Sequence, residues 1–338
     1  MPRKTAPGQA RIHDVAEAAG VSLMTVSRSV RGLDGVSETT RSRVLAIAQK
    51  LNYIPNSNAR ALASTHTPII GISLPTLFND VFADVLSGMR STFEQAGYAT
   101  IVETSDYDPE RDLSWAERTL GFRPAAMILT GCDHAPDLRP LLLREQVPTL
   151  EIWDTTDDPI DICVGIDHFA EGSRLGQYAV SLGYRAPAFV GAPEGFDRRA
   201  DKRAAGIALA FAEAGAKTLE RVRVTGTNAF AMGAEGMARL RGHDRDVAFF
   251  LSDHLAFGGI MALEREGGRV PADMGVVGFN GVDLTAVLPR TMTTMVTPRR
   301  KIGVVGARHL LARLNNVNVA KVTRLTSTLV EGETLQHR

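Results

Sequence analysis

The sequence predicts a small all-α head followed by an α/β body of two doubly wound parallel-sheet lobes. Residues 11–51 show helical periodicity alone. From Pro68 onward, short apolar runs alternate with amphipathic helical stretches. About nine strands over about 270 residues exceed one ordinary sheet, so two lobes are expected. Ligands of such folds bind at the carboxyl ends of the strands, which here means the cleft between the lobes.

The head is predicted to contain three short helices. The first spans about 12–19 and ends at Gly20, where the chain must turn. Ser22 is a suitable N-cap for the second helix, and Ser37 for the third. The third helix stops before Pro55, because proline restricts the residue that precedes it. Two helices joined by a tight turn are the layout of a helix-turn-helix.

The body is predicted from eight apolar runs that are typical of buried strands. These runs are 69–75, 98–104, 125–131, 147–153, 186–192, 221–226, 247–253 and 274–280. The helices between them often end at glycine, as at Gly97, Gly183 and Gly215. We therefore expect a helix-turn-helix domain over 1–55, a linker or hinge helix over 56–67, and a two-lobed effector-binding and dimerisation domain over 68–338.

The composition excludes several classes of protein. The 338 residues are 44% hydrophobic, which favours a large core over disorder. Cys132 and Cys163 form no CxxC pair, so we expect free thiols. The eight histidines are scattered without ligand spacing, and neither a metal nor a cofactor is expected. Without a secretory leader or a run of about 20 apolar residues, the protein is expected to be cytoplasmic.

The net charge of zero hides a basic head and an acidic body. Residues 1–65 contain nine lysines and arginines against four acidic residues, a net charge of +5, so the remainder carries −5. A basic head with helical periodicity is typical of nucleic-acid binding, whereas a merely solubilising tail would lack the periodicity.

The second head helix has the pattern of a DNA-reading helix. Val26 and Val30 lie on its inner face, which leaves Leu23, Met24 and Arg28 to project outward near its N-terminus. Arginine can bind guanine through two hydrogen bonds, and apolar side chains can contact thymine methyl groups. The alternative is that Leu23 and Met24 belong to the core of a small helical domain.

Two segments of the head and linker resemble those of a known protein family. IHDVAEAAGVSLMTVSRSV (12–30) and VSETTRSRVLAIAQKLNYIPNSNARALAS (36–64) resemble the head of the LacI/GalR family of transcription regulators. The shared pattern is D-V-A-x-x-A-G-V-S-x-x-T-V-S-R, followed by L-x-Y-x-P-N-x-x-A-R-x-L. The resemblance implies a ligand-switched regulator, usually a repressor, that binds double-stranded operator DNA and has a periplasmic-binding-protein-like body.

The resemblance also implies which residues contact DNA. The linker of the family becomes a hinge helix on DNA, and a leucine from each hinge wedges into the minor groove and kinks the operator. Leu62 occupies that position, and unstacking base pairs requires an apolar side chain. The expected DNA-binding set is Ser22, Leu23, Met24, Thr25, Ser27, Arg28, Tyr53, Asn56, Ala59 and Leu62, with Thr25, Ser27 and Tyr53 suited to phosphate contacts.

The effector site of the family lies between the lobes, and several positions match it. Arg203 has the R-x-x-G spacing of the family, and arginine can bind a ligand hydroxyl or carboxylate through two hydrogen bonds. Phe82 is either a stacking platform for the ligand or a core side chain. The remaining expected effector-binding residues are Glu151, Asp167, Asp197, Arg199, Asn228, Ser252, Asp253 and Asn280.

Departures from the family pattern bear on the identity of the effector. Asn280 stands where relatives that bind sugars or purines usually have aspartate, and Asn228 stands where relatives often have an aromatic residue. Residues 157–184 most resemble the gluconate-repressor branch of the family. A sugar acid such as gluconate is therefore expected ahead of a neutral sugar or a purine, for regulation of a carbohydrate or sugar-acid operon.

Two other functions have weaker support. An enzyme of doubly wound fold is disfavoured, because the sequence has no G-x-G-x-x-G opening a helix, no phosphate-binding G-x-x-x-x-G-K-[ST], no G-x-S-x-G and no H-E-x-x-H. A sugar-transport protein would need a secretion signal and no DNA-binding head. A homodimer assembled through the body is expected, because one head buries too little surface for tight DNA binding. No heptad tail follows Leu329, so a coiled-coil tetramer is not expected.

The hinge assignment gives a first prediction. Leu62→Ala should weaken operator binding and reduce operator bending, because the wedge that unstacks the central base step is lost. Effector affinity should be unchanged. Gel shifts with circularly permuted operator fragments measure both effects, and a variant that binds and bends DNA like the parent would show that Leu62 is no wedge.

Overall fold

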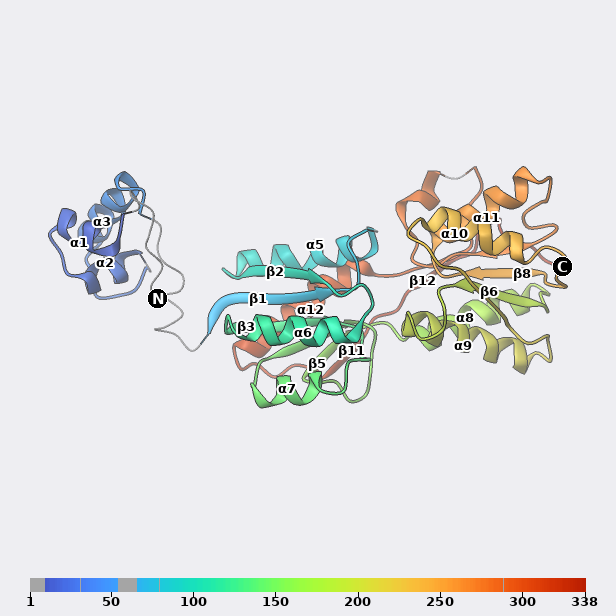
Figure 1. Cartoon of the computed structure of the whole chain (residues 1–338), viewed down its shortest axis with the longest axis horizontal. Helices are drawn as coiled ribbons and strands as arrows, with labels where there is room; N and C mark the ends of the chain where they lie inside the picture. Colours follow the sequence, from blue (N-terminus) through green and yellow to red (C-terminus); the bar gives the residue numbers. More distant parts are fainter. Residues whose placement is uncertain (1–9, 31, 54–65, 79, 288) are drawn as a thin grey trace. The chain divides into compact units, whose positions relative to one another are not determined.

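The computed structural model describes residues 10–30, 32–53, 66–78, 80–287 and 289–338 (Figure 1). The chain forms two compact units, Met1–Thr67 and Pro68–Arg338, which are the head and the body. Most of the predicted linker, residues 56–65, lies outside the described residues, and Thr67 is the first residue of strand β1. Within the described ranges, no helix is long and apolar enough to cross a membrane.

The head consists of the three predicted helices, α1 (Ile12–Ala19), α2 (Leu23–Val30) and α3 (Glu38–Lys50). Gly20 turns the chain between α1 and α2 at a φ of 63°, in the left-handed region that glycine adopts readily. Both predicted serine caps are present: the Ser22 hydroxyl accepts the Thr25 N–H at 3.1 Å, and the Ser37 hydroxyl accepts the Thr40 N–H at 3.3 Å. Apolar side chains from all three helices form one core.

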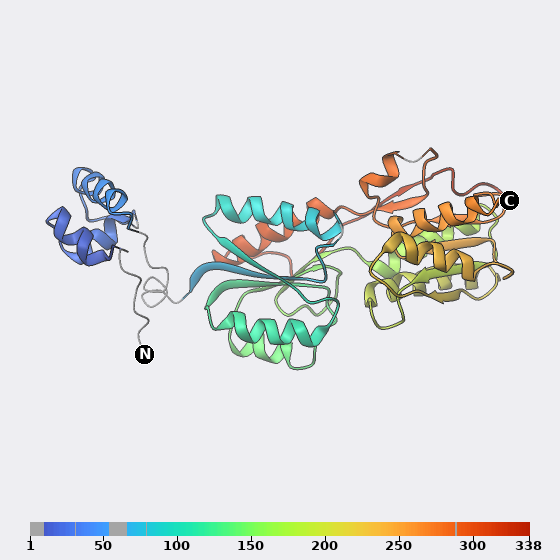
Figure 2. The ribbon, with the colours of Figure 1, turned by 45° about the horizontal axis from the view of Figure 1, so that its top comes forward.

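Lobe 1 of the body is built on a six-stranded parallel sheet with the order β11-β5-β4-β3-β1-β2. The strands are β1 (Thr67–Leu74), β2 (Ala99–Thr104), β3 (Pro124–Thr130), β4 (Thr149–Trp153), β5 (Ile162–Gly165) and β11 (Val322–Arg324). Helices α5 (Asp80–Gln95) and α12 (Arg299–Leu314) cover one face, and α6 (Pro109–Leu120) and α7 (Leu138–Arg144) cover the other (Figure 2).

Lobe 2 has a four-stranded parallel sheet with the order β7-β6-β8-β9. Its strands are β6 (Pro187–Gly191), β7 (Glu220–Arg223), β8 (Val247–Phe250) and β9 (Gly275–Val277). Helices α8 (His168–Ser181) and α9 (Arg198–Glu213) pack together on one face, and α10 (Ala229–Arg239) and α11 (Asp253–Arg265) on the other (Figure 1). A short 3-10 helix, Asp283–Val287, follows β9.

The chain passes between the lobes three times, at about 165–168, 296–299 and 324–328. Strands β10 (Thr294–Val296) and β12 (Thr328–Val330) pair antiparallel beside these crossovers. All eight predicted strands are confirmed within a few residues. Strands β5, β10, β11 and β12 were not predicted: they have three or four residues each, and β10, β11 and β12 lie among polar residues.

The contact between α8 and α9 requires two glycines. A Cβ on Gly172 would lie 2.1 Å from the Arg203 carbonyl oxygen, and one on Gly206 would lie 2.1 Å from the Phe169 carbonyl oxygen. The two helix backbones therefore touch, and this contact fixes the position of the α9 face that carries the arginines.

Gly172→Ala should lower the free energy of unfolding by about 1–3 kcal/mol, because the added methyl group forces α8 and α9 apart. Urea unfolding measures this loss. Gln177→Ala, at an exposed position of the same helix, is the matched control and should change stability little. Equal stability of the two variants would contradict the close helix contact.

Candidate functional site

A hollow lies at the carboxyl ends of the lobe 1 strands and is closed from the other side by lobe 2. The space between its walls is about 450 Å³ and is open to solvent. Loops after β1, β2 and β3 supply one wall, and the loop before α9 with the start of that helix supplies the other. Its lining includes Tyr107, Asp112, Thr130 and Asp133 from lobe 1 and Phe196, Arg198 and Arg199 from lobe 2.

Helix α9 carries three cations on one face, at Arg199, Lys202 and Arg203, because residues three and four apart lie side by side on a helix. Arg199 binds the Asp197 carboxylate at 2.9 Å and lies over the Tyr107 ring, 5.5 Å from its centroid. Burial raises the pKa of Asp197, but attraction to Arg199 and Arg203 outweighs burial and lowers that pKa to about 2.

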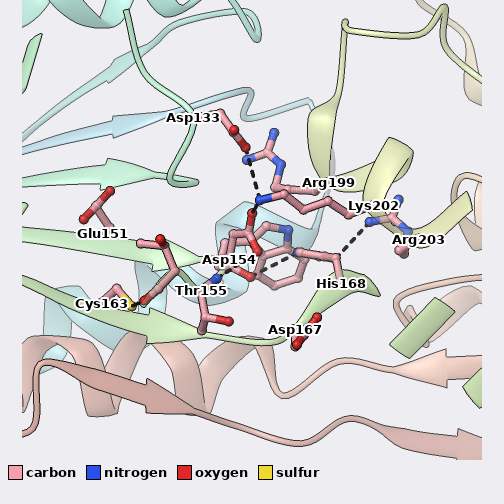
Figure 3. A network of polar contacts seen from close by, with 12 residues as sticks. Asp133, Glu151, Asp154, Thr155, Cys163, Asp167, His168, Arg199, Lys202 and Arg203 are labelled. Carbon is pink, nitrogen blue, oxygen red and sulfur yellow. Dashed lines mark hydrogen bonds and ion pairs between the residues drawn. The ribbon is translucent and has the colours of Figure 1, made fainter. Parts of the chain in front are cut away.

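Lys202 joins the two lobes across the cleft (Figure 3). Its ammonium group lies 2.5 Å from the Asp154 carboxylate, after β4, and 3.2 Å from Asp133, after β3. Asp154 is buried, and burial raises its pKa while the nearby Lys202 opposes that shift. One cation from lobe 2 thus pairs with two carboxylates from lobe 1, so the negative charge of these carboxylates is only partly balanced.

His168, the first residue of α8, is a buried support for Arg203. Its Nε2 lies 3.1 Å from the Trp153 carbonyl oxygen, which can only accept, so Nε2 carries the proton. Burial and the nearby arginines lower the pKa of His168 well below its usual value, and the ring is neutral. Its Nδ1 therefore accepts a hydrogen bond from Arg203 Nη1 at 3.1 Å (Figure 3).

Arg203 is a buried cation with no carboxylate in direct contact, although the charge of Asp197 acts on it from farther away. Its side chain lies over the Phe279 ring, 4.1 Å from the centroid, and Nη2 donates to the Leu251 carbonyl at 3.3 Å. Burial lowers its pKa to about 10, so it stays charged at neutral pH. Among the described residues, no carboxylate oxygen lies within 4.0 Å of it. A buried charge is costly unless it is paired, so this guanidinium is suited to bind an anion.

Asn280 lies next to Phe279 at the edge of the interlobe crossovers. Its backbone has a φ of 105°, and its carbonyl oxygen accepts Arg299 Nη1 at 2.6 Å. The side chain is only 8% exposed, and its Oδ1 has no hydrogen-bond partner within the described part of the chain. An unpaired buried acceptor costs about 1–3 kcal/mol, which a ligand donor would recover.

Two of the expected effector residues have strong partners within the core of lobe 1. Phe82 is buried at the start of α5, with its ring edge-on to Trp153 at 5.5 Å. Glu151 is buried in β4, where it binds the His134 ring at 2.9 Å and the Ile160 N–H at 2.7 Å. The structure thus favours the core alternative for Phe82, and an effector role of either residue stays a prediction.

Four other expected effector residues are bonded to backbone groups of lobe 2. Asp167, Asn228 and Ser252 are the N-caps of α8, α10 and α11. Asp253 is fully buried, accepts the Val282 N–H and the Thr294 hydroxyl, and has a pKa raised by burial to about 6. None of the four lines the hollow, and neither do Arg203 and Asn280, which lie behind its wall. The effector role of the four also stays a prediction.

The hollow and its surroundings include residues that the sequence did not single out: Tyr107, Asp112, Asp133, Asp154, His168 and Lys202. A signal for some of them was present. Asp133 and Asp154 follow β3 and β4 directly, at the sheet edge where ligands bind, and Lys202 lies on the helix face of Arg199 and Arg203.

On the head, α2 exposes the side chains expected to read DNA. Leu23 and Met24 are 38% and 65% exposed, and Arg28 is exposed, so Leu23 and Met24 are not core residues. Ser22 caps the helix, Thr25 and Ser27 are half-buried, and Tyr53 packs against the head core. The predicted contacts at Asn56, Ala59 and Leu62 lie outside the described residues.

A helix-turn-helix head on a two-lobed body with a polar interlobe hollow defines the class of ligand-responsive DNA-binding regulators. Residues 11–56 match the model for bacterial regulatory proteins of the lacI family, and residues 177–335 match that for a periplasmic binding protein-like domain. The chain is 33% identical over 324 residues to the HTH-type transcriptional regulator GntR of Escherichia coli strain K12, covering 95% of this chain and 97% of the relative.

Two solved structures agree with this match. A LacI-family transcriptional regulator from Silicibacter pomeroyi has a TM-score of 0.90 at 34% identity and covers 97% of this chain and 99% of its own. The lac repressor dimer bound to operator and the anti-inducer ONPF has a TM-score of 0.84 at 26% identity, with the same coverage. The chain belongs to the lacI family of bacterial regulatory proteins and is a ligand-responsive transcriptional regulator.

The Asp197–Arg199 pair predicts a pH dependence. Because the folded-state pKa of Asp197 is lowered from 3.8 to about 2, its contribution to stability is present above pH 3.8 and is lost as the pH falls toward 2. Asp197→Asn should therefore lower the free energy of unfolding by about 2 kcal/mol at pH 7, and by less below pH 4.

Urea unfolding of parent and variant between pH 7 and pH 3 measures the difference. Asparagine caps helices as well as aspartate does, so loss of the cap does not contribute. Asp167→Asn, at the exposed cap of α8, is the control. A stability difference that stays constant through the acid range would show that the charge of Asp197 is not what stabilises the body.

Proposed function

We propose that the effector is a sugar acid, such as gluconate, and that Arg203 binds its carboxylate. The observation that carries this proposal is a buried guanidinium with no carboxylate within 4.0 Å among the described residues. A ligand carboxylate would supply the missing charge and accept two parallel hydrogen bonds from the remaining N–H groups. The neutral His168 and the Phe279 ring hold the guanidinium in place without neutralising it.

Asn280 supports an acid over a neutral sugar. An aspartate here would place a negative charge beside that of the ligand, whereas asparagine offers one acceptor and two donors without charge. Its Oδ1 has no partner in the described part of the chain and suits a ligand hydroxyl. The resemblance of residues 157–184 to the gluconate-repressor branch and the match to GntR of E. coli favour the same class of effector.

We further propose that the protein represses a carbohydrate or sugar-acid operon in the cytoplasm, as a homodimer on a near-palindromic operator. The lac repressor, which is similar over 97% of this chain, is a dimer in its operator complex. We assign the cleft to binding rather than catalysis, because the chain belongs to a family of DNA-binding regulators. An effector that binds both lobes changes DNA affinity by the same factor by which DNA changes effector affinity.

Calorimetric titration with D-gluconate, D-glucose and hypoxanthine tests the effector class. Gluconate should bind the parent protein more tightly than the other two, and Arg203→Ala should weaken gluconate binding roughly 100-fold, since two hydrogen bonds to a charged group are lost. Arg221→Ala is the matched control, because it removes an arginine that also lies over a phenylalanine ring, Phe189, but is already paired with the Asp201 carboxylate.

Either of two results would refute the assignment. One is tighter binding of glucose or hypoxanthine than of gluconate. The other is undiminished gluconate binding by Arg203→Ala.

A further inference from the structure

Asp112 is a carboxylate on the wall of the hollow, and its contacts indicate a second recognition site for the ligand besides Arg203. It lies in the first turns of α6, which Asp108 caps and Pro109 starts. Its Oδ1 accepts a hydrogen bond from the hydroxyl of Ser73, a buried residue of β1. The Thr130 hydroxyl in turn donates to the Ser73 carbonyl at 2.9 Å. Two strands and a helix thus hold Asp112 in one position on the hollow wall.

The other carboxylates around the hollow each lie in direct contact with a cation of the chain. Asp197 is paired with Arg199, and Lys202 binds both Asp133 and Asp154. Asp112 differs, since no lysine or arginine of the described ranges lies within 4.0 Å of its oxygens. Burial raises its pKa in spite of the hydrogen bonds from Ser73 and Ser105 and the attraction of His134 and Arg199, so the protein stabilises its negative charge incompletely.

The chemistry of this position favours hydroxyl groups as ligands. An ionised carboxylate has about four acceptor positions, and the hydroxyl groups of Ser73 and Ser105 occupy two of them. Hydroxyl groups can fill the others without adding charge. A ligand ammonium would instead be repelled by Arg199, whose positive charge already acts on Asp112 from the opposite wall.

We propose that Asp112 forms a hydroxyl-binding subsite that recognises the polyol part of the effector, on the lobe 1 wall of the hollow. This inference rests on the proposed function only in placing the effector in the interlobe hollow. It makes the effector class more specific: a carboxylate for Arg203 at one end and two or more hydroxyl groups for Asp112 elsewhere. Asp112 then distinguishes a sugar acid from a simple carboxylic acid of equal length.

The test uses Asp112→Asn in the full-length protein, titrated calorimetrically with three six-carbon acids. D-gluconate has both groups, hexanoate has the carboxylate alone, and 6-aminohexanoate has an ammonium at the far end. The parent should bind gluconate more tightly than the other two. Asp112→Asn should weaken gluconate binding roughly 10- to 100-fold, because charged hydrogen bonds are lost, and should leave hexanoate binding unchanged.

Asp108→Asn is the matched control, because it removes a carboxylate from the same helix at a position outside the hollow lining, where asparagine is an equally good cap. It should bind all three acids like the parent. If Asp112→Asn does not fold by circular dichroism, Asp112→Ser retains a hydroxyl partner for Ser73 and serves the same comparison.

Equal gluconate affinity of Asp112→Asn and parent would overturn the subsite, as would a loss of gluconate and hexanoate binding in equal measure. Binding of 6-aminohexanoate as tight as that of gluconate would overturn the preference for hydroxyl groups. If the parent binds D-glucose but not gluconate, the sugar-acid proposal fails. Weaker glucose binding by Asp112→Asn would then still support the subsite, and unchanged glucose binding would overturn it. Binding of none of the four compounds by the parent would overturn both.

Discussion

The backbone contact between α8 and α9 is the constraint on which the ligand cleft depends. Gly172 and Gly206 let the two helices touch, and this places Arg203 beside His168, 35 residues earlier in the chain. His168 in turn bonds the Trp153 carbonyl at the end of a lobe 1 strand. A chain of short contacts therefore runs from the core of lobe 2 to lobe 1, and each member is buried, so displacement of one shifts the others.

Much of the fold could be predicted from the sequence, because its signals are local. The helices of the head are marked by Gly20, Ser22 and Ser37, and each has the expected conformation or hydrogen bond. The eight predicted strands each overlap a run of six or seven residues that is rich in apolar side chains. Strands β5, β10, β11 and β12 lack a run of that length and are defined by their neighbours in the sheet.

The candidate site was harder to predict, because a polar residue at a strand end has two common uses. It can cap the helix that follows, or it can face a ligand. Asp167, Asn228 and Ser252 have side-chain bonds typical of caps, whereas Asp133 and Asp154, in equivalent places, face Lys202. Only the fold distinguishes them, since Lys202 lies 48 residues beyond Asp154. The spacing around Arg203 was informative because it lies within one helix.

The state of pairing of each polar group decides what it contributes to recognition. Groups that are satisfied within the chain, such as the Lys202–Asp154 pair between the lobes, stabilise the cleft whichever ligand binds. We infer that selectivity comes from groups whose bonding the chain leaves incomplete: the Arg203 guanidinium, the Asn280 Oδ1 and the Asp112 carboxylate. One is a cation, one a neutral acceptor and one an anion. A ligand that satisfies all three must combine an acid group with several hydroxyl donors, which neither a purine nor a simple fatty acid does.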